Sequence, residues 1–329
     1  MKVCVAGGAG FIGSNFISYM INKYRDIQIV CLDALTYAGN LENLESVKEN
    51  TNFKFYRGNI LDNDFLSDVF AKEHFDLVLN FAAETYAHKS IKDSNLFLKT
   101  NIIGTKNLMD MCLKYNVKKF HQVSTDEIHE NLHSYDEKFF CNNDKLNLSS
   151  IYFFTKASSD MLALCYCKNS DLEVTISRSA NNYGPYQYPE KFIPSIIVKA
   201  IGNEKIFFNK NRKFMKLVHV YDHVIAIDKI IRTGKSGNIY NIFSCEEIDE
   251  LELTKKVLSF LNKDESLIVL KNNEKLDENN FYNNIENLDS NLSFECKIKI
   301  FEGLKHTVNW YLNNLNWVEM VLKDKYIEV

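Results

Sequence analysis

The sequence predicts an α/β protein in which a doubly wound parallel sheet carries a smaller, mixed α/β lobe toward the C-terminus. Two observations predict this class. Through residues 1–180, short apolar runs alternate with longer segments of helical periodicity. The apolar runs are continuous, which is typical of strands buried on both faces. Repeated strand–helix alternation with buried strands indicates a parallel sheet covered by helices on both sides.

The elements of this first part follow one another in order. The first helix is expected where apolar residues recur at Phe16, Ile17, Met20 and Ile21, which places them on one helical face. The strands are expected at 2–7, 28–33, 53–60, 76–83, 119–124 and 173–179. The helices are expected at 11–24, 64–73, 101–116 and 152–167.

The pattern loosens after residue 180. A mixture of loop and helix is expected over 181–202, and the Asn-rich stretch 271–291 is expected to be mostly loop. The remaining elements are a strand and a helix over 216–234, a strand at 237–242 and a closing helix at 301–315. We expect a dinucleotide-binding domain over 1–178, to which 213–240 returns, and a substrate lobe formed by 179–212 and 241–329.

Bulk composition excludes several classes of protein. The net charge is −4 without a basic block, which disfavours a nucleic-acid partner. The sequence has no apolar run of the ~18 residues that a membrane-spanning helix needs, and its N-terminus does not resemble a signal peptide. The eight cysteines form no metal-binding pattern, so we expect no metal site. We expect them to be reduced, as in a cytoplasmic protein.

A glycine motif stands between the first strand and the first helix. Gly7, Gly10 and Gly13 permit a tight turn, and the backbone N–H groups and the helix N-terminus can then accept a pyrophosphate. Asp33 ends the second strand about 20 residues later, where a carboxylate hydrogen-bonds a ribose 2′-hydroxyl and repels a 2′-phosphate. The motif therefore predicts a Rossmann-type site for NAD in preference to NADP.

Tyr152 and Lys156 are four residues apart on an expected helix, so they share one face. An ammonium close to a phenol favours the phenolate and lowers its pKa. A phenolate can take a proton from a sugar hydroxyl while a hydride leaves the carbon. A surface pair at this spacing is the structural alternative.

An acidic pair follows the strand at 119–124. Thr125 can hydrogen-bond a substrate hydroxyl, and Asp126 and Glu127 come directly after it. Two carboxylates with different pKa values can divide the work of removing one proton and donating another, as elimination of water requires. The alternative is that they cap a helix or face solvent.

Nearly the whole chain resembles the nucleoside-diphosphate-glucose 4,6-dehydratases, which belong to the extended short-chain dehydrogenase/reductase group. The most specific segments are LTYAGN, STDE and NNYGPYQYPEK. General sugar epimerases lack the Asp-Glu pair. The segments that carry the resemblance are GGAGFIGSNF, DALTYAGNLENL, FAAET, TNIIGT, STDEI, SSIYFFTKASSD, NNYGPYQYPEKFIP, YNI and GLKHTVNWYL.

The resemblance implies a role for each candidate catalytic residue. Tyr152 would be the base at the C4 hydroxyl of the glucose, with Lys156 assisting and Thr125 hydrogen-bonding that hydroxyl. Glu127 would remove the C5 proton, and Asp126 would protonate the C6 hydroxyl as water leaves. NAD would take the C4 hydride and return it to C6.

The resemblance also implies the binding residues and the assembly. We expect a homodimer formed by the helices around 101–115 and 152–168. NAD would be bound by Gly7, Gly10, Phe11, Ile12, Gly13, Asp33, Asn59, Ile60, Ala82, Ala83, Thr100, Tyr152 and Lys156. The nucleotide sugar would be bound by Glu84, Thr125, Asn181, Glu190, Lys191, Arg212 and Asn241.

The chain departs from the family at the diphosphate. Met215, Lys216 and Leu217 stand where the family has an Arg-Asp-Trp, and the family's arginine-rich stretch is absent. Lysines or an arginine nearby could act as point charges, which leaves UDP-glucose and dTDP-glucose both open as substrates. The candidates are Lys191, Arg212, Lys213 and Lys216. The alternatives are another NAD-dependent nucleotide-sugar epimerase or decarboxylase, and a non-catalytic binding protein.

Overall fold

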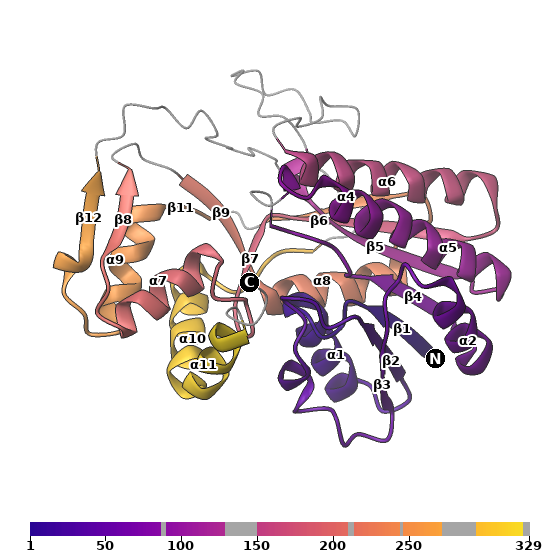
Figure 1. Ribbon diagram of the computed structural model, residues 1–329, viewed down its shortest axis with the longest axis horizontal. Helices are drawn as coiled ribbons and strands as arrows, with labels where there is room; N and C mark the ends of the chain where they lie inside the picture. Colours follow the sequence, from indigo (N-terminus) through magenta and orange to yellow (C-terminus); the bar gives the residue numbers. More distant parts are fainter. Residues whose placement is uncertain (87–89, 129–149, 210–213, 244–245, 272–293, 325–329) are drawn as a thin grey trace.

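The computed structural model describes residues 1–86, 90–128, 150–209, 214–243, 246–271 and 294–324. Its largest sheet has seven strands in the order β10-β6-β5-β4-β1-β2-β3, and all neighbouring pairs are parallel (Figure 1). The predicted parallel sheet is thereby confirmed. The strands are β1 Lys2–Ala6, β2 Gln28–Asp33, β3 Phe53–Arg57, β4 Leu77–Asn80, β5 Lys119–Thr125, β6 Glu173–Ser179 and β10 Ile239–Ile242.

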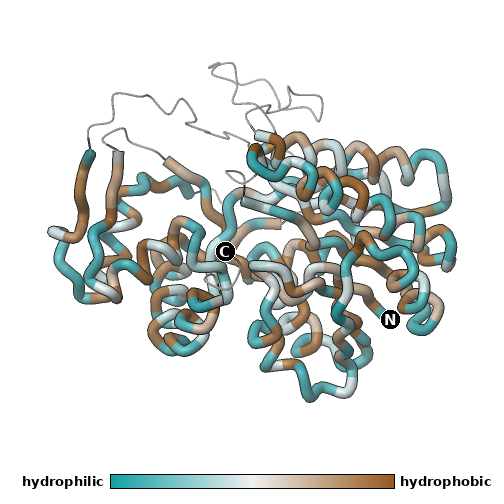
Figure 2. Tube along the Cα trace, viewed as in Figure 1, coloured by the Kyte–Doolittle hydropathy of each residue, from teal (hydrophilic) through white to brown (hydrophobic). Residues whose placement is uncertain are grey.

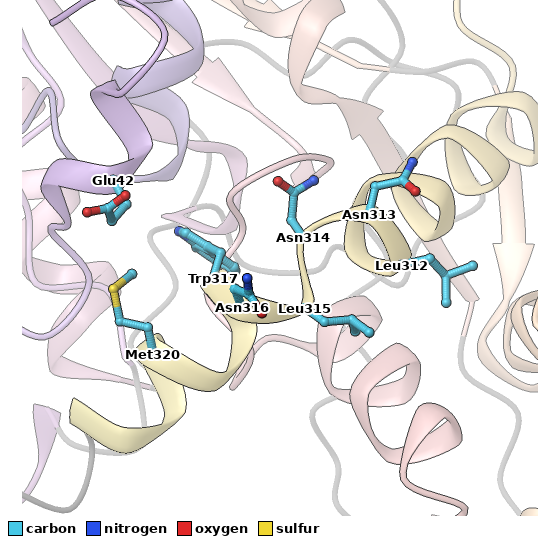
Figure 3. Close-up of a pocket in the computed structure, with 8 residues that line it drawn as sticks. All are labelled: Glu42, Leu312, Asn313, Asn314, Leu315, Asn316, Trp317 and Met320. Atoms are coloured by element: carbon cyan, nitrogen blue, oxygen red, sulfur yellow. The ribbon is translucent and has the colours of Figure 1, made fainter.

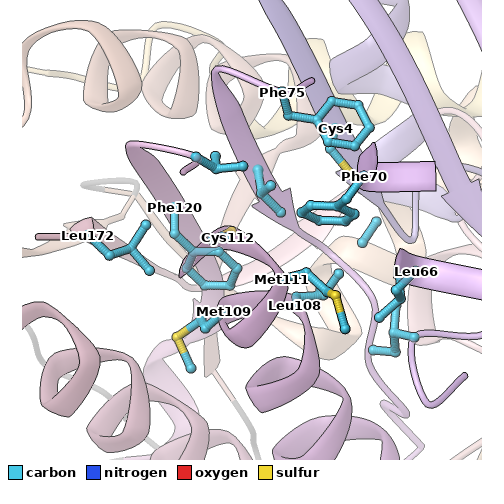
Figure 4. Packing of buried hydrophobic residues seen from close by; sticks show 14 of the residues in the cluster. Cys4, Leu66, Phe70, Phe75, Leu108, Met109, Met111, Cys112, Phe120 and Leu172 are labelled. Atoms are coloured by element: carbon cyan, nitrogen blue, oxygen red, sulfur yellow. The ribbon is translucent and has the colours of Figure 1, made fainter. Parts of the chain in front are cut away.

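Helices cover both faces of this sheet. Helices α1 (Phe11–Lys23) and α8 (Val220–Thr233) pack together on one face. Helices α2 (Asn63–Glu73), α5 (Thr105–Lys114) and α6 (Ile151–Asn169) lie on the other. Buried side chains of these helices, such as Phe70 of α2 and Met109 of α5, pack in one apolar cluster with side chains of the sheet, such as Phe120 of β5 (Figure 4). The continuous apolar strands of the sequence are buried because both faces are covered.

The strand order reverses between β1 and β4. The chain runs outward from β1 through β2 to β3, and then returns to the other side of β1 with β4, β5 and β6. In open parallel sheets, such a reversal leaves a crevice at the carboxyl ends of the two strands. The glycine turn after β1 and the segment after β4 both open onto that crevice.

The helical segment before α5 begins earlier than expected. Instead of starting at residue 101, it starts with α4 (Ser94–Phe97), where the Asp93 side chain accepts the Leu96 N–H, and continues as a π-helix over Leu98–Gly104. The widened turn brings Gly104 against Ile60, and a Cβ at position 104 would lie 2.4 Å from that side chain. A larger residue at position 104 would require the Ile60 side chain to move.

The C-terminal part forms a second apolar core around Ile197, Leu253, Leu304 and Tyr311. Sequence periodicity missed four of its strands, which are only three or four residues long, and also the helices at 250–260 and 315–324. The strands are β7 Asn181–Tyr183, β9 Phe214–His219 and β11 Glu247–Asp249 in one sheet, and β8 Ile206–Asn209 paired with β12 Ile268–Lys271. The helices are α7 Phe192–Ile201, α9 Glu250–Phe260, α10 Ile300–Asn313 and α11 Leu315–Asp324, with a short 3₁₀ turn at η4 Glu265–Leu267. Two further 3₁₀ turns lie in the N-terminal part, at η1 Leu41–Leu44 and η3 Asp126–Ile128.

A buried hydrogen-bonded link joins the C-terminal helices to the glycine turn. The Trp317 indole N–H of α11 donates to Asn43 Oδ1 at 2.8 Å, and the Asn43 amide donates to the Ala9 carbonyl oxygen at 2.8 Å. Beside this link, η1 and the α10–α11 turn line an open groove of about 560 Å³ that includes Glu42 and Met320 (Figure 3). The link therefore couples the position of α11 to the backbone of the glycine turn.

Replacing Trp317 with Phe keeps an aromatic ring but removes the N–H. The buried Asn43 oxygen then loses its partner, so we expect the free energy of unfolding to fall by about 1–3 kcal/mol. Chemical denaturation monitored by circular dichroism measures the change. Trp310→Phe is the matched control, because no hydrogen bond of the Trp310 indole to a described residue is found; equal losses for the two variants would contradict the prediction.

Candidate active site

The β1–α1 turn is built from glycines at positions that exclude a side chain. Gly7 has φ +75°, and a Cβ there would lie 2.5 Å from the Ala82 nitrogen. A Cβ on Gly13 would lie 2.4 Å from the Gly7 carbonyl oxygen. The turn therefore presents bare backbone beside the first turn of α1, which is the arrangement that a pyrophosphate needs.

Asp33 stands at the end of β2 with its carboxylate turned toward this turn. Asp33 Oδ2 accepts the Ala9 N–H at 2.9 Å, and Oδ1 accepts the Leu35 N–H at 2.8 Å. Burial raises the pKa of Asp33, while these two backbone N–H groups oppose the rise by stabilising the carboxylate. The carboxylate is thus fixed in place by the chain before any ribose hydroxyl reaches it.

A cavity of about 120 Å³ opens at the carboxyl ends of β1, β2 and β4. Because Asp33 lines it beside the glycine turn, we assign it to the adenosine side of a dinucleotide. The predicted residues that line it are Gly7, Gly10, Asp33, Asn59, Ile60, Ala82, Ala83 and Thr100. Glu84, which was expected to contact the sugar, lines this cavity, and the sequence reasoning did not anticipate Thr36, Ala38, Gly39 or Leu96.

A second cavity, of about 270 Å³, adjoins the first and shares Gly7, Gly10 and Ala83 with it. It brings together residues that lie far apart in the sequence. The predicted residues that line it are Gly7, Gly10, Phe11, Ile12, Gly13, Ala83, Thr125, Glu127, Tyr152, Lys156, Asn181, Glu190 and Lys191. Most of the predicted catalytic set therefore faces one space beside the glycine turn.

The acidic pair after β5 forms the short turn η3, and its two members differ. Glu127 lines the cavity, its backbone N–H donates to Thr125 Oγ1, and its Oε1 accepts the Asn181 amide at 3.3 Å. Burial raises the pKa of Glu127, and Asn181 and the charge on Lys191 partly offset the rise. Asp126 is 4% exposed and does not line the cavity. The residues 129–149 that follow lie outside the described part of the chain.

Tyr152 and Lys156 project from α6 into the cavity. Lys156 Nζ donates to the Val123 carbonyl oxygen at 2.7 Å, which fixes the lysine against the end of β5. Burial lowers the pKa of Lys156 to about 8. Burial also raises the pKa of Tyr152, and the nearby carboxylates of Glu127 and Asp126 raise it further. In the protein alone the expected lowering of the phenol pKa is therefore wrong, because desolvation and negative charge dominate.

Lys191 is a second lysine that lines this cavity, in addition to Lys156. Its Nζ donates to the Thr85 carbonyl oxygen at 3.4 Å. Burial lowers the pKa of Lys191, while the carboxylates of Glu190 and Glu127 raise it. Arg212 and Lys213 lie outside the described residues, so their predicted contacts stay predictions.

Asn241 does not line either cavity. It lies in β10, in register with Arg178 of β6, and its Oδ1 is buried without a hydrogen bond to any described residue. The resemblance implied a substrate contact here; the structure places Asn241 on the edge strand of the seven-stranded sheet, outside the lining of both cavities, and the contact stays a prediction. β-sheet register decides this, and register is a tertiary property.

Several residues that line the sugar-side cavity were missed as contacts, among them Tyr37, Thr85, Gln187 and Tyr188. Tyr37 donates or accepts a hydrogen bond with Thr85 at 3.3 Å, and its ring packs edge-on against Tyr188. Gln187 donates to the Asn182 carbonyl oxygen from the same wall. The sequence did contain a signal for these contacts, because they lie in segments that carry the family resemblance. Tyr37 lies in LTYAGN, Thr85 in FAAET, and Gln187 and Tyr188 in NNYGPYQYPEK.

The site geometry defines a class of protein: a Rossmann-type, dinucleotide-dependent enzyme whose reacting groups lie beside the glycine turn. Residues 3–242 match the NAD-dependent epimerase/dehydratase family. The chain belongs to this family, and its dinucleotide site is an NAD site. Within the described residues no group of three potential metal ligands occurs, and no helix there is long and apolar enough to cross a membrane.

Individual relatives agree over nearly the full length. The chain is 35% identical to a dTDP-D-glucose 4,6-dehydratase of Dictyostelium discoideum over 99% of this chain and 85% of the relative. A dTDP-glucose 4,6-dehydratase of Bacillus anthracis, crystallised with NAD, superimposes with TM-score 0.86 at 35% identity, covering 98% and 99% of the two chains. DesIV of Streptomyces venezuelae, a dTDP-glucose 4,6-dehydratase with NAD bound, gives TM-score 0.88 at 31% identity, covering 98% and 100%.

Gly7→Ala tests the turn. The methyl group would meet the Ala82 backbone, and its φ is strained for any L side chain, so we expect a loss of about 1–3 kcal/mol of stability and loss of bound NAD. Thermal unfolding and the NAD content of the purified protein measure both effects. In Gly10→Ala the new methyl would meet only the Gly7 carbonyl oxygen at 3.4 Å, so this control should keep its stability. A Gly7→Ala protein with normal stability and NAD content would refute the account.

Proposed function

We propose that the protein is a nucleoside-diphosphate-glucose 4,6-dehydratase that converts UDP-glucose or dTDP-glucose to the 4-keto-6-deoxyglucose nucleotide and water. The observation that carries the proposal is that Thr125, Glu127, Tyr152 and Lys156 line one cavity beside the NAD turn. Alcohol oxidation alone needs the threonine, the tyrosine and the lysine. The carboxylate of Glu127 is the additional group that an elimination requires.

The oxidising half of the site consists of Thr125, Tyr152 and Lys156. When bound, NAD supplies the acceptor for the C4 hydride and the donor that returns it to C6. Tyr152 removes the C4 hydroxyl proton, and Thr125 hydrogen-bonds that hydroxyl. Lys156 is anchored by the Val123 carbonyl oxygen, so its charge stays beside the phenol as the phenolate forms.

The eliminating half of the site is the acidic pair. A ketone at C4 makes the C5 proton acidic, and Glu127 removes it; Asn181 orients the carboxylate, and burial raises its pKa toward a value suited to a base. Asp126 is the proton donor to the C6 hydroxyl by family resemblance; because it is buried and does not line the cavity, its side chain has to turn toward the sugar to donate its proton as the C–O bond breaks. Glu127, protonated in the elimination, then returns a proton to C5 when C6 accepts the hydride that bound NAD would supply.

The nucleotide end of the substrate is assigned to the lobe formed by 179–212 and 241–329. Lys191 supplies a positive charge on the wall of the cavity, and a point charge of this kind contacts phosphate without the forked geometry of arginine. This leaves uracil and thymine bases both compatible with this contact to the diphosphate.

Cysteines buried in the core, such as Cys4, Cys31 and Cys112, support a cytoplasmic location.

The test is incubation of the purified protein in D₂O with UDP-glucose and, separately, with dTDP-glucose. Mass spectrometry of the sugar nucleotides should show loss of one water and gain of deuterium at C5. The faster substrate identifies the preferred base. Formation of a C4 epimer without water loss would instead assign the protein to the epimerases, and no reaction from protein with bound NAD would favour a binding role.

Glu127→Gln and Asp126→Asn should separate the two halves of the elimination. Glu127→Gln removes the C5 base, so both deuterium exchange at C5 and water loss should fall by about 10²–10⁴-fold. Asp126→Asn keeps the base but removes the acid, so substrate should be recovered with deuterium at C5 while water loss falls. Exchange that persists in Glu127→Gln, or disappears only in Asp126→Asn, would reverse the assignment.

We further propose a homodimer formed through α5 and α6. These helices lie side by side on one outer face, and hydrophobic and hydrophilic stretches alternate along them (Figures 1 and 2). Large apolar side chains are exposed on these helices and on the π-helix before α5, namely Ile103 at 46%, Leu113 at 42%, Phe154 at 44% and Met161 at 50%. A second copy of the chain would bury them.

Met161→Glu should disrupt this dimer, because burying an unpaired carboxylate in the interface is unfavourable. Light scattering after size-exclusion chromatography should give the mass of one chain for the variant and of two chains for the wild type. Leu312→Glu on α10 is the matched control, since Leu312 is 42% exposed on another face. A variant that keeps the wild-type mass would exclude this interface.

A further inference from the structure

A buried ion pair lies directly behind the catalytic lysine. Asp160 is one helical turn beyond Lys156 on α6 and is 0% exposed, and Arg178 of β6 is 5% exposed. Arg178 Nε donates to Asp160 Oδ2 at 2.9 Å. Both charges are deep in the interior, where their effect on a neighbouring charge is least screened by water.

The pair belongs to a polar row beneath α6. Ser124 of β5 is in register with Arg178 of β6, so both side chains point to the α6 face of the sheet. Burial raises the pKa of Asp160, while the charges of Arg178 and Lys156 and the buried Ser124 hydroxyl oppose the rise by stabilising the carboxylate. The negative charge that Asp160 keeps therefore acts on both Arg178 and Lys156.

Tyr152, Lys156 and Asp160 recur at four-residue spacing, so they form one stripe along α6. His121 makes its hydrogen bonds to Thr175 and Ser177, on the opposite face of the sheet. The titratable and charged groups around Lys156 come from three elements: Tyr152 and Asp160 from α6, Asp126 and Glu127 from η3, and Arg178 from β6. Asp160 is the carboxylate that acts on Lys156 from within its own helix.

We propose that Asp160 and Arg178 are positioning residues that set the charge of Lys156: Asp160 keeps the lysine protonated, and Arg178 limits how strongly it does so. The inference deepens the proposed function and rests on it for its catalytic meaning. Burial strips water from Lys156 and favours its neutral form, whereas the proposed role requires an ammonium beside Tyr152. A purely structural ion pair would pin α6 to β6 without affecting the lysine charge.

Removing the two charges one at a time should shift the pKa of Lys156 in opposite directions. A purely structural ion pair would not produce opposite shifts, so the two roles can be distinguished. Asp160→Asn removes the attraction and leaves Arg178, so the pKa of Lys156 should fall from about 8 by about one unit. Arg178→Gln removes the repulsion and leaves Asp160, so the pKa should rise. The double variant removes both charges, so its value should lie between those of the two single variants.

The measurement is nuclear magnetic resonance of the protein with ¹³C,¹⁵N-labelled lysine, titrated without substrate. The Lys156 signal is identified by its loss in Lys156→Arg. This readout does not depend on activity, so it tests the ion pair even if the chain proves not to be a dehydratase. Loss of folding in one single variant still leaves the other and the double variant to be compared.

The pH profile of turnover is the second readout. In Asp160→Asn the alkaline limb should move to lower pH with the Lys156 titration, and in Arg178→Gln it should move to higher pH. At pH 8 about a tenth of Lys156 would remain protonated in Asp160→Asn, against about half in the wild type. Shifts of the same sign in both variants, or no shift in either, would overturn the proposal and leave the pair a structural one.

Discussion

The rest of the structure depends on one close approach: the backbone of Gly7 packs against the backbone of residue 82, where the strand order reverses between β1 and β4. No side chain fits there, since a Cβ would lie 2.5 Å from the Ala82 nitrogen. Two adjoining cavities lie beside this contact at the carboxyl ends of the strands. We assign one to the adenosine part of NAD, and the other brings the proposed reacting groups beside the glycine turn.

Around that crevice, α6 serves as the rigid support for catalysis. It carries Tyr152 and Lys156 into the cavity, and the bond from Lys156 to the Val123 carbonyl oxygen anchors it to β5. Asn101 in the π-helix donates to Thr155 of α6 and to the Glu84 carbonyl oxygen, so the same helix is tied to the segment after β4. Reacting groups on a helix and a strand end keep their spacing better than groups on loops.

Burial gives the site its chemistry as well as its shape. Desolvation raises the pKa of Glu127 toward a value suited to a base, and it lowers the pKa of Lys156 to about 8, which works against the ammonium that the proposed oxidation needs. The cost is that Tyr152 is held in its phenol form until a positive charge offsets the carboxylates near it. Fixing the charge of Lys156 is therefore central to the oxidation, and the ion pair behind it becomes part of the site.

The sequence by itself determined the parallel sheet, the NAD turn with Asp33, and most of the lining of the sugar-side cavity. Strand alternation, glycine spacing and the Tyr152–Lys156 interval are local patterns that leave a direct trace in the chain. Tertiary structure decided the remainder. β-sheet register placed Asn241 beside Arg178 and away from the cavity. Burial decided the direction of the Tyr152 pKa, and only the packing of α6 on β6 brought Asp160 to Arg178, because neither depends on sequence spacing alone.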